Sequence, residues 1–284
     1  MNPRVRRILV SAAVVIGVFL LAGATYQGVA TAVERREFPA PGHMIDVGGH
    51  QLHIHCTGDG APVVILEAPG MSPSAAWGWV QLTVTRVTRV CSYDRAGLGW
   101  SEANVEPFDP SRVPVELHAL LMGAKVRGPY VLAGQALGAA FVRLYAKRYP
   151  GDVAGLVLVE PGRAGEAAPR ADPRFLTLSP WLARAGVLRA TRMLSRAAVG
   201  LPQRSAGAVS SFLNRPDHLT RAARELVRSD DAVRLAADGP VPNGRPMVVL
   251  DSVTRDRLSI LADESAAKQV SDAILRVVAT VRKN

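Results

Sequence analysis

The 284-residue chain has only two cysteines, few aromatic residues (5%) and no histidine after His218. It also contains no internal repeat and no low-complexity tract. With 48% hydrophobic and 20% charged residues it can bury a full core, which excludes wholesale disorder. No nucleic-acid-binding motif accompanies its net charge of +10, so we expect neither DNA nor RNA as a partner.

The amino-terminal stretch predicts a membrane anchor. Three arginines within the first seven residues precede an uncharged run at 8–33, long enough for a helix across a hydrocarbon core of about 30 Å. Because such arginines stay in the cytoplasm, we expect a single-pass anchor over 1–33, a linker over 34–43, and the remaining chain on the extracytoplasmic side. The alternative is a signal peptide cleaved near Ala22-Gly23-Ala24, which would secrete the domain.

The two cysteines, Cys56 and Cys91, each end a short apolar run. An exported chain with one even pair can form a disulfide. We therefore predict a Cys56–Cys91 bond, the alternative being two buried thiols.

Beyond the linker, short β-branched runs alternate with helical patterns. The runs at 62–67 (PVVILE) and 153–159 (VAGLVLV) are typical of strands buried on both faces. The alternation predicts an α/β domain over 44–284 with a doubly wound, mostly parallel sheet. Further strands are expected at 44–47, 51–56, 88–93, 130–133, 246–250 and, most weakly, 258–262, and helices at 75–82, 113–124, 137–149 and 266–282.

Residues 161–243 break this alternation and predict an inserted helical cap. Residues 161–228 carry twelve arginines against four acidic residues, which indicates either a solvated helical surface or a site for anionic lipid or an acidic partner. Within the cap we expect one amphipathic helix over 180–197, which either packs on the sheet or rests on a membrane. Its basic face comprises Arg184, Arg189, Arg192 and Arg196.

The junction at 130–139 carries the most chemical information. A predicted strand runs directly into a predicted helix through Gly134-Gln135-Ala136-Leu137-Gly138. This is the setting of a nucleophile elbow, G-x-S-x-G, in which a serine stands on a tight turn. Both glycines are present, but the central residue is Ala136, whose methyl group cannot attack a carbonyl carbon.

Three stretches resemble the α/β-hydrolase fold superfamily, and within it the exported actinobacterial-type members. Residues 38–58 resemble the opening hairpin, 90–101 (VCSYDRAGLGWS) the DRxGxGxS loop, and 128–150 the elbow with its following helix. The resemblance implies hydrolysis of esters, amides or related bonds by a serine–histidine–acid triad, without a cofactor. It also implies two backbone N–H donors for an oxyanion.

The chain departs from that family pattern at two of the three triad positions. Ala136 occupies the nucleophile position, and Ala267 stands where the resemblance places the histidine. For the third triad position, the acid, the sequence offers three candidates: Asp256 is preferred over Asp251, and Glu160 is the runner-up. In this mechanism an acid that has no histidine to orient does nothing.

An oxyanion-binding site is still expected beside the elbow. The backbone N–H groups of Leu137 and Gly70 are its candidate donors, since Pro69 cannot donate, and Gln135 is a further binding candidate. Such a site would hold a small acyl or carboxylate ligand.

The remaining polar candidates have ordinary structural interpretations. Ser101 is expected to be a turn serine, and Asp94-Arg95 are expected to fix the geometry of their loop. His53 and His55 alternate on one strand face and are predicted to be exposed; no third metal ligand accompanies them. His218 is expected at the surface of the cap.

The leading hypothesis is a membrane-anchored pseudo-hydrolase that acts in binding or scaffolding. The first alternative is an esterase or amidase that uses displaced residues. The second is an active serine hydrolase represented by an altered sequence, with Ala136 introduced. The missing histidine argues against the second alternative, because inactivation needs only one substitution.

Overall fold

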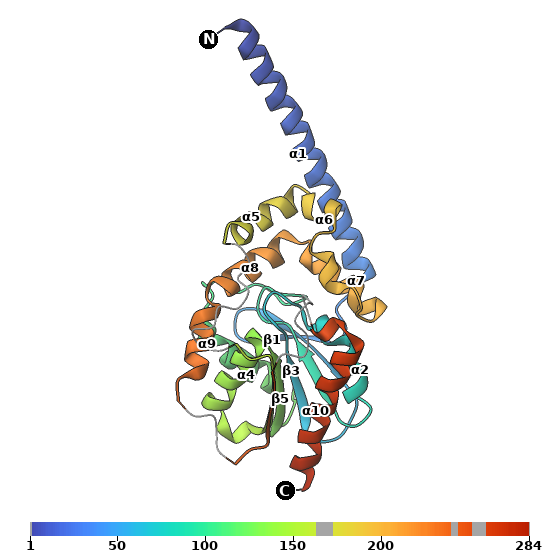
Figure 1. Cartoon of the computed structure of the whole chain (residues 1–284), viewed down its shortest axis with the longest axis vertical. Coiled ribbons are helices and arrows are strands. Elements are labelled where there is room, and N and C mark those ends of the chain that lie inside the picture. The colour runs from blue at the N-terminus through green and yellow to red at the C-terminus, as the bar shows by residue number, and fades with distance from the viewer. Residues whose placement is uncertain (1, 163–172, 240–243, 252–259, 284) are drawn as a thin grey trace.

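The computed structural model describes residues 2–162, 173–239, 244–251 and 260–283 (Figure 1). In this part of the chain a seven-stranded sheet has the order β1-β2-β4-β3-β5-β6-β7. The pairs β1–β2 and β2–β4 are antiparallel and the others parallel, which confirms the predicted mostly parallel sheet. The strands are β1 (His43–Asp46), β2 (Gln51–Thr57), β3 (Val63–Glu67), β4 (Val90–Tyr93), β5 (Tyr130–Gln135), β6 (Val153–Val159) and β7 (Met247–Leu250).

Helices cover both faces of the sheet. Val64 and Leu66 of β3 pack against one layer, made by α2 (Gly78–Val84) and α10 (Glu264–Lys283). Ile65 points the other way, toward α3 (Val113–Gly123) and α4 (Leu137–Arg148). Successive strand residues point to opposite faces, so a strand covered on both sides must be apolar throughout. This explains the continuous apolar runs and confirms the doubly wound architecture.

The inserted cap lies between β6 and β7 and covers one end of the sheet (Figure 1). Its described helices are α5 (Pro173–Arg184), α6 (Val187–Thr191), α7 (Gln203–Leu213), α8 (Pro216–Val227) and α9 (Ser229–Ala237). Short 3₁₀ turns are η1 (Ser74–Trp77), η2 (Pro110–Arg112), η3 (Pro150–Asp152), η4 (Ser195–Ala198) and η5 (Ile260–Ala262).

Two predicted elements are wrong. The single helix over 180–197 is broken, because Gly186 adopts a left-handed conformation (φ 72°) between α5 and α6. Because of this turn, Arg189 does not lie on the predicted basic face with Arg184. Of the last predicted strand, 258–259 lie outside the described residues, and 260–262 form the 3₁₀ turn η5.

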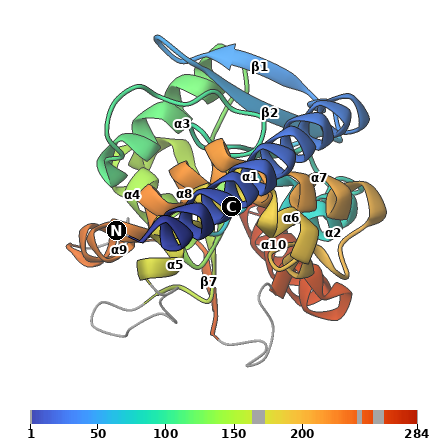
Figure 2. The same cartoon turned by 90° about the horizontal axis from the view of Figure 1, so that it is seen from above.

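Helix α1 (Pro3–Glu37) continues past Val33 into the segment expected to be a linker. Its most apolar 18-residue window has a mean hydropathy of 2.5 and is not buried inside the protein. By length and composition the helix can cross a membrane. Its amino-terminal part projects away from the domain, and in the view from above it crosses the cap helices (Figures 1 and 2).

The carboxyl-terminal part of α1 docks on the cap. The Gln27 side chain donates to the backbone oxygen of Asn214 (2.7 Å) and accepts from Arg189 Nε (2.9 Å). Glu34 forms an ion pair with Arg189. A Cβ at Gly23 would overlap the carbonyl oxygen of Ala185, so the two backbones touch there.

This docking limits the length of α1 that is free of the domain. Residues Pro3–Ala22 precede the first close contact with the cap, at Gly23. At 1.5 Å per residue they span about 30 Å, the thickness of a hydrocarbon core. The cap therefore lies beside the point where a membrane-spanning segment would end.

The predicted disulfide is confirmed. Cys56 of β2 and Cys91 of β4 are directly opposite in the antiparallel register, and their sulfur atoms are bonded. Their Cα atoms are 4.0 Å apart. The bond ties the outer hairpin to the central sheet.

Candidate active site

The turn between β5 and α4 has the backbone of a nucleophile elbow. Ala136 has φ 50° and ψ −114°, a conformation that costs free energy for any residue with a side chain. The flanking glycines are required sterically: a Cβ at Gly138 would lie 2.6 Å from the backbone oxygens of both Glu67 and Ala68, and one at Gly134 would overlap Gly138. The elbow interpretation of the sequence therefore describes the local geometry correctly.

The elbow presents no nucleophile. Ala136 is partly exposed and carries only a methyl group, while its N–H donates to the oxygen of Val159 (2.9 Å). The neighbouring Gln135 is buried and donates from Nε2 to Glu160 (3.3 Å). No described residue hydrogen-bonds to the buried Gln135 Oε1.

The two expected oxyanion donors lie close together. A Cβ at Gly70 would lie 3.4 Å from Cδ2 of Leu137, so the loop after β3 packs directly on the start of α4. Leu137 is the first residue of α4, and the first N–H groups of a helix have no partner within it. The structure thus brings together Gly70 and Leu137, as the sequence predicted, although the side chains of Leu137 and Leu226 crowd the space beside Gly70.

Two of the three acid candidates, Glu160 and Asp251, lie in the described part of the chain. Glu160 follows β6 in a left-handed conformation (φ 46°) and contacts Gln135. Asp251 is exposed at the end of β7. Asp256 lies outside the described residues.

The expected histidine position is not in a loop. Ala267 is inside α10 and is buried in the core with Val80 and Val270. A buried helical position in a packed layer presents its side chain to that layer rather than to an open site. The helix predicted over 266–282 thus includes Ala267 as expected, and α10 begins two residues earlier, at Glu264.

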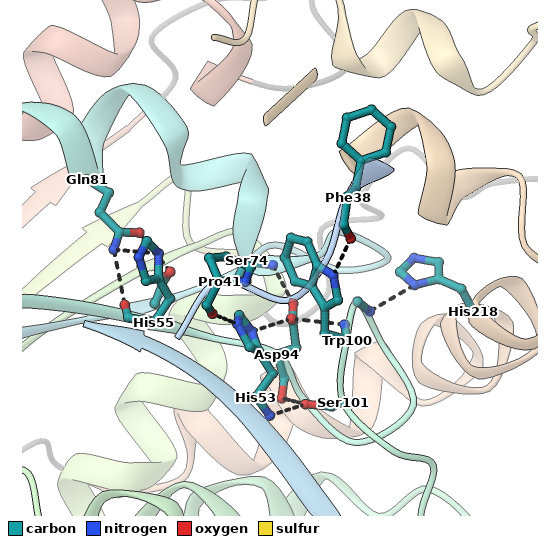
Figure 3. Close-up of polar contacts among 12 residues, drawn as sticks. Phe38, Pro41, His53, His55, Ser74, Gln81, Asp94, Trp100, Ser101 and His218 are labelled. Atoms are coloured by element: carbon teal, nitrogen blue, oxygen red, sulfur yellow. Dashed lines mark hydrogen bonds and ion pairs between the residues drawn. The ribbon is translucent and has the colours of Figure 1, made fainter. Parts of the chain in front are cut away.

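Two histidines that the sequence analysis placed at the surface are buried. His53 is completely buried, and His218 is 2% exposed. Both predictions were wrong because segments distant in sequence cover them: residues 38–41 cover His53, and the loops holding Met71 and Gly99 cover His218 (Figure 3). His55 is only half-buried. Within the described part of the chain no three His, Cys, Asp or Glu residues are placed to hold a metal ion.

His53 and Asp94 form a buried charged pair (Figure 3). His53 Nδ1 lies 2.8 Å from Asp94 Oδ2, and its Nε2 contacts the carbonyl oxygen of Pro41. The backbone carbonyl oxygen of Pro41 can only accept a hydrogen bond. The Asp94 carboxylate likewise acts as an acceptor, since it also receives hydrogen bonds from the N–H groups of Ser74 (2.6 Å) and Trp100 (3.1 Å). Each ring nitrogen must therefore carry a proton, which makes His53 an imidazolium.

The electrostatics of His53 agree with this assignment. Burial alone would lower its pKa, but the hydrogen bond and charge of Asp94, together with the Pro41 carbonyl, raise the pKa above 6.5. His218 has the opposite balance, because burial lowers its pKa. Its Nδ1 accepts from the N–H of Gly99 (3.1 Å) and its Nε2 donates to the oxygen of Met71 (2.8 Å), as a neutral ring does.

We expect the stability of the protein to fall at alkaline pH because of His53. A raised folded-state pKa gives a stabilisation that is fully present below the unfolded value of 6.5 and is lost as pH rises through the folded value. Urea unfolding of the full chain between about pH 6 and about pH 9 measures this loss. His53→Gln should flatten the decline, while His218→Gln, whose pKa is shifted the other way, should not flatten it and should steepen it slightly between about pH 6 and about pH 7. Equal slopes for wild type and His53→Gln would contradict the imidazolium.

A second buried cluster lies beneath the elbow. Arg95 donates from Nε and Nη2 to Glu225 (both 2.8 Å), from Nη1 to Glu67, and also to the backbone oxygen of Ala68 (2.7 Å). Tyr93 donates to the other oxygen of Glu67. Burial raises the pKa of Glu67 to about 7, although Arg95 opposes the shift. The sequence analysis missed Glu67 and Glu225 as members of a cluster. For Glu67 a signal was available, because an acidic residue at the end of a continuously apolar strand is unusual.

This cluster joins three parts of the fold. Glu67 ends β3, Arg95 belongs to the DRxGxGxS-like loop, and Glu225 lies on cap helix α8. The contacts of Asp94 and Arg95 with backbone N–H groups and buried carboxylates agree with the loop-fixing role predicted for them. Neither Glu67 nor Glu225 is exposed, so the cluster positions backbone rather than meeting solvent.

A cavity of about 340 Å³ lies away from the elbow. It is bounded by α2, α7, the half-buried strand residues His55 and Thr57, and the segment Phe38–Pro41, which follows α1. Ala136, Leu137 and Gly70 are not among its described lining residues. The cavity therefore differs in place from the oxyanion site predicted from sequence.

Comparison with known proteins agrees with this geometry. The sequence profile of the Alpha/beta hydrolase family matches residues 51–281, so the chain belongs to that family. It is 13% identical to the Cif epoxide hydrolase from Acinetobacter nosocomialis, with a TM-score of 0.63 over 87% of this chain and 96% of that one. At that identity the likeness concerns the fold alone.

Two curated relatives match shorter regions. An uncharacterized vacuolar membrane protein of Saccharomyces cerevisiae is 30% identical over 137 residues, covering 42% of this chain and 21% of the yeast protein. The 2-hydroxy-6-oxo-2,4-heptadienoate hydrolase of Pseudomonas putida is 29% identical over 120 residues, covering 42% of this chain and 44% of the hydrolase. The chain thus spans about a fifth of the length of the yeast protein and under half that of the bacterial enzyme.

Proposed function

We propose that this protein is a membrane-anchored, catalytically inactive member of the α/β-hydrolase family that binds a ligand or partner outside the cytoplasm. One observation carries the proposal: the elbow keeps its strained backbone but ends in the methyl group of Ala136. Covalent acyl transfer requires a nucleophile and a base that activates it. The elbow provides no nucleophile, and no histidine follows His218 in the sequence.

The two buried histidines, His53 and His218, favour the proposal because both nitrogens of each ring already form hydrogen bonds. Both ring nitrogens of His53 face acceptors, and both of His218 are hydrogen-bonded to backbone groups. A general base must have a lone pair free to take the proton of the nucleophile. Neither buried ring meets that requirement as it is bonded in this fold.

The same contacts weigh against an esterase or amidase that uses displaced residues. Ser101, a candidate replacement nucleophile, donates from Oγ to the backbone oxygen of Asp94 (2.6 Å). It also accepts from the N–H of His53 (2.8 Å) and is buried. Its hydroxyl therefore fixes the loop after β4.

An extracytoplasmic domain is supported by two independent features. The arginines before the apolar part of α1 favour the cytoplasmic side, and the Cys56–Cys91 disulfide is expected to persist in an oxidising compartment. The vacuolar membrane relative in yeast is consistent with membrane association.

The basic cap is well placed to meet anionic lipid. Trp181 of α5 is 67% exposed and stacks under Arg184, close to the docking point of α1 at Gly23. Aromatic and basic side chains at that depth suit an interface with lipid headgroups. Arg189 takes no part, because it is paired with Glu34 of α1.

The test of inactivity uses the full chain in nanodiscs, because α1 contacts the cap. We expect neither labelling by a fluorophosphonate probe nor turnover of p-nitrophenyl esters by the wild type. We also expect no turnover by Ala136→Ser, because a serine at that turn has no base to activate it. Loss of the triad histidine costs about 10⁶-fold in kcat in the serine protease subtilisin.

An active serine hydrolase in the same nanodiscs serves as the positive control. Rapid labelling of the wild type at any serine would overturn the proposal. Burst release of product by Ala136→Ser alone would reveal a base near the elbow and support the alternative of an altered, formerly active enzyme.

A further inference from the structure

The cavity beside the membrane anchor has the form of a ligand site. We name the segment Phe38–Pro41 the strap; it links α1 to the first strand and forms one wall of the cavity. At about 340 Å³ the cavity falls within the range of small-molecule sites, roughly 300–1,000 Å³.

The strap is held firmly against the domain. Trp100 donates from its indole nitrogen to the backbone oxygen of Phe38 (3.0 Å), and His53 binds the oxygen of Pro41 (Figure 3). The Phe38 ring lies directly against α7, because a Cβ at Gly207 would overlap it. These contacts give the cavity a preformed apolar wall.

One cation stands at the rim of this apolar cavity. Arg204 of α7 is exposed, and within the described part of the chain no carboxylate is paired with it. None of the described lining residues is an aspartate or glutamate. A cation beside an apolar lining suits a ligand that has an apolar body and an anionic end.

The charge of the site limits that anionic end to a single charge. Burial, with the neighbouring charges of His53 and Arg204, lowers the pKa of His55, so its ring is neutral at neutral pH and offers a hydrogen bond only. The imidazolium of His53 is neutralised by Asp94. Arg204 therefore supplies one net positive charge, which matches a carboxylate better than a phosphate dianion.

We propose that the strap cavity binds a long-chain carboxylate, with the apolar chain against Phe38, Ala75 and Ala208 and the carboxylate at Arg204. The strap continues directly from the domain-proximal end of α1, 15 residues or about 22 Å of helix beyond the docking point at Gly23, so the cavity lies on the same side of any membrane that α1 crosses. A free fatty acid leaving the bilayer has this chemistry. The inference gives the proposed non-catalytic binding function a ligand class and a site distinct from the elbow.

The binding test uses the full chain in phosphatidylcholine nanodiscs with dansyl-undecanoic acid as the probe. We expect saturable fluorescence enhancement above that of empty nanodiscs. Arg204→Glu and Leu82→Glu, both exposed lining positions, should weaken binding by at least about tenfold, as loss of a charge-assisted contact predicts. Arg224→Glu, at an exposed arginine on α8 outside the cavity, is the matched control and should bind like the wild type.

Three outcomes would overturn the proposal: unchanged binding in both cavity variants, equal affinity for the corresponding dansyl alcohol, or no saturable binding. A diazirine fatty acid locates the site, and we expect crosslinks on the strap and α7. Crosslinks confined to the elbow loop around Gly70 and Leu137 would place the ligand at the predicted oxyanion site instead. Hydrolysis of a long-chain p-nitrophenyl ester would refute catalytic inactivity, whereas the crosslinks would still report on the cavity.

Discussion

Arg95→Met is expected to lower the free energy of unfolding by about 3–5 kcal/mol, because it removes one partner from a buried ionic cluster. Arg95 is 3% exposed and lies between Glu67 and Glu225, which are 1% and 0% exposed. Without the guanidinium two carboxylates remain buried and uncompensated. Urea unfolding of the full chain in detergent micelles, followed by tryptophan fluorescence, measures the change.

Arg112→Met provides the matched control for this prediction. Arg112 pairs with Glu106, but both side chains are substantially exposed, so the change should cost no more than about 1 kcal/mol. The triple variant Arg95→Met/Glu67→Gln/Glu225→Gln removes all three charges and should recover much of the loss. If Arg95→Met costs no more than Arg112→Met, or if the triple variant is less stable than Arg95→Met, the cluster does not act as described.

Loss of the disulfide is expected to have an effect of similar size. Cys56 and Cys91 are 35 residues apart in sequence, and the chain-entropy relation gives about 3–4 kcal/mol for closing a loop of that length. The double variant Cys56→Ala/Cys91→Ala should therefore unfold at clearly lower urea than the oxidised wild type. The bond matters here because it fastens the outer hairpin, which carries His53 and His55, to the central sheet.

Reduction of the wild type distinguishes the effect of losing the disulfide from the effect of replacing the two cysteine side chains. Dithiothreitol should shift the urea midpoint of the wild type most of the way toward that of the double variant and leave the variant unchanged. Coincident unfolding curves for reduced and oxidised wild type would show that the bond contributes nothing to the stability of the domain.

The elbow and the strap cavity differ in the surroundings of their polar groups. The elbow backbone is retained because Gly134 and Gly138 also pack α4 against β3, a structural need that is independent of catalysis. Meanwhile the polar groups around the neighbouring loops are tied to one another rather than directed at a substrate. The strap cavity combines an apolar lining with Arg204, for which the described residues include no paired carboxylate.

The local features of this fold could be predicted from sequence because they depend on near neighbours. The strand at 153–159 is read from a continuous apolar run, and the helix beginning at Leu137 from the turn that precedes it. The prediction of one amphipathic helix over 180–197 was wrong, although it too was based on near neighbours. The prediction placed Gly186 inside the helix, but Gly186 adopts a left-handed conformation, which ends α5 and starts α6 in a new direction.

The sequence by itself determined the buried strands, the apolar amino-terminal helix and the absence of a nucleophile at Ala136, because each follows from residue types at short spacings; the disulfide followed because the chain has only two cysteines. Only the tertiary structure decided that His53 and His218 are buried, that Arg95 joins Glu67 to Glu225, and that the cavity lies beside the strap. These features join residues tens to more than a hundred positions apart. The burial and the pKa of a side chain depend on what packs against it, and spacing along the chain does not reveal that.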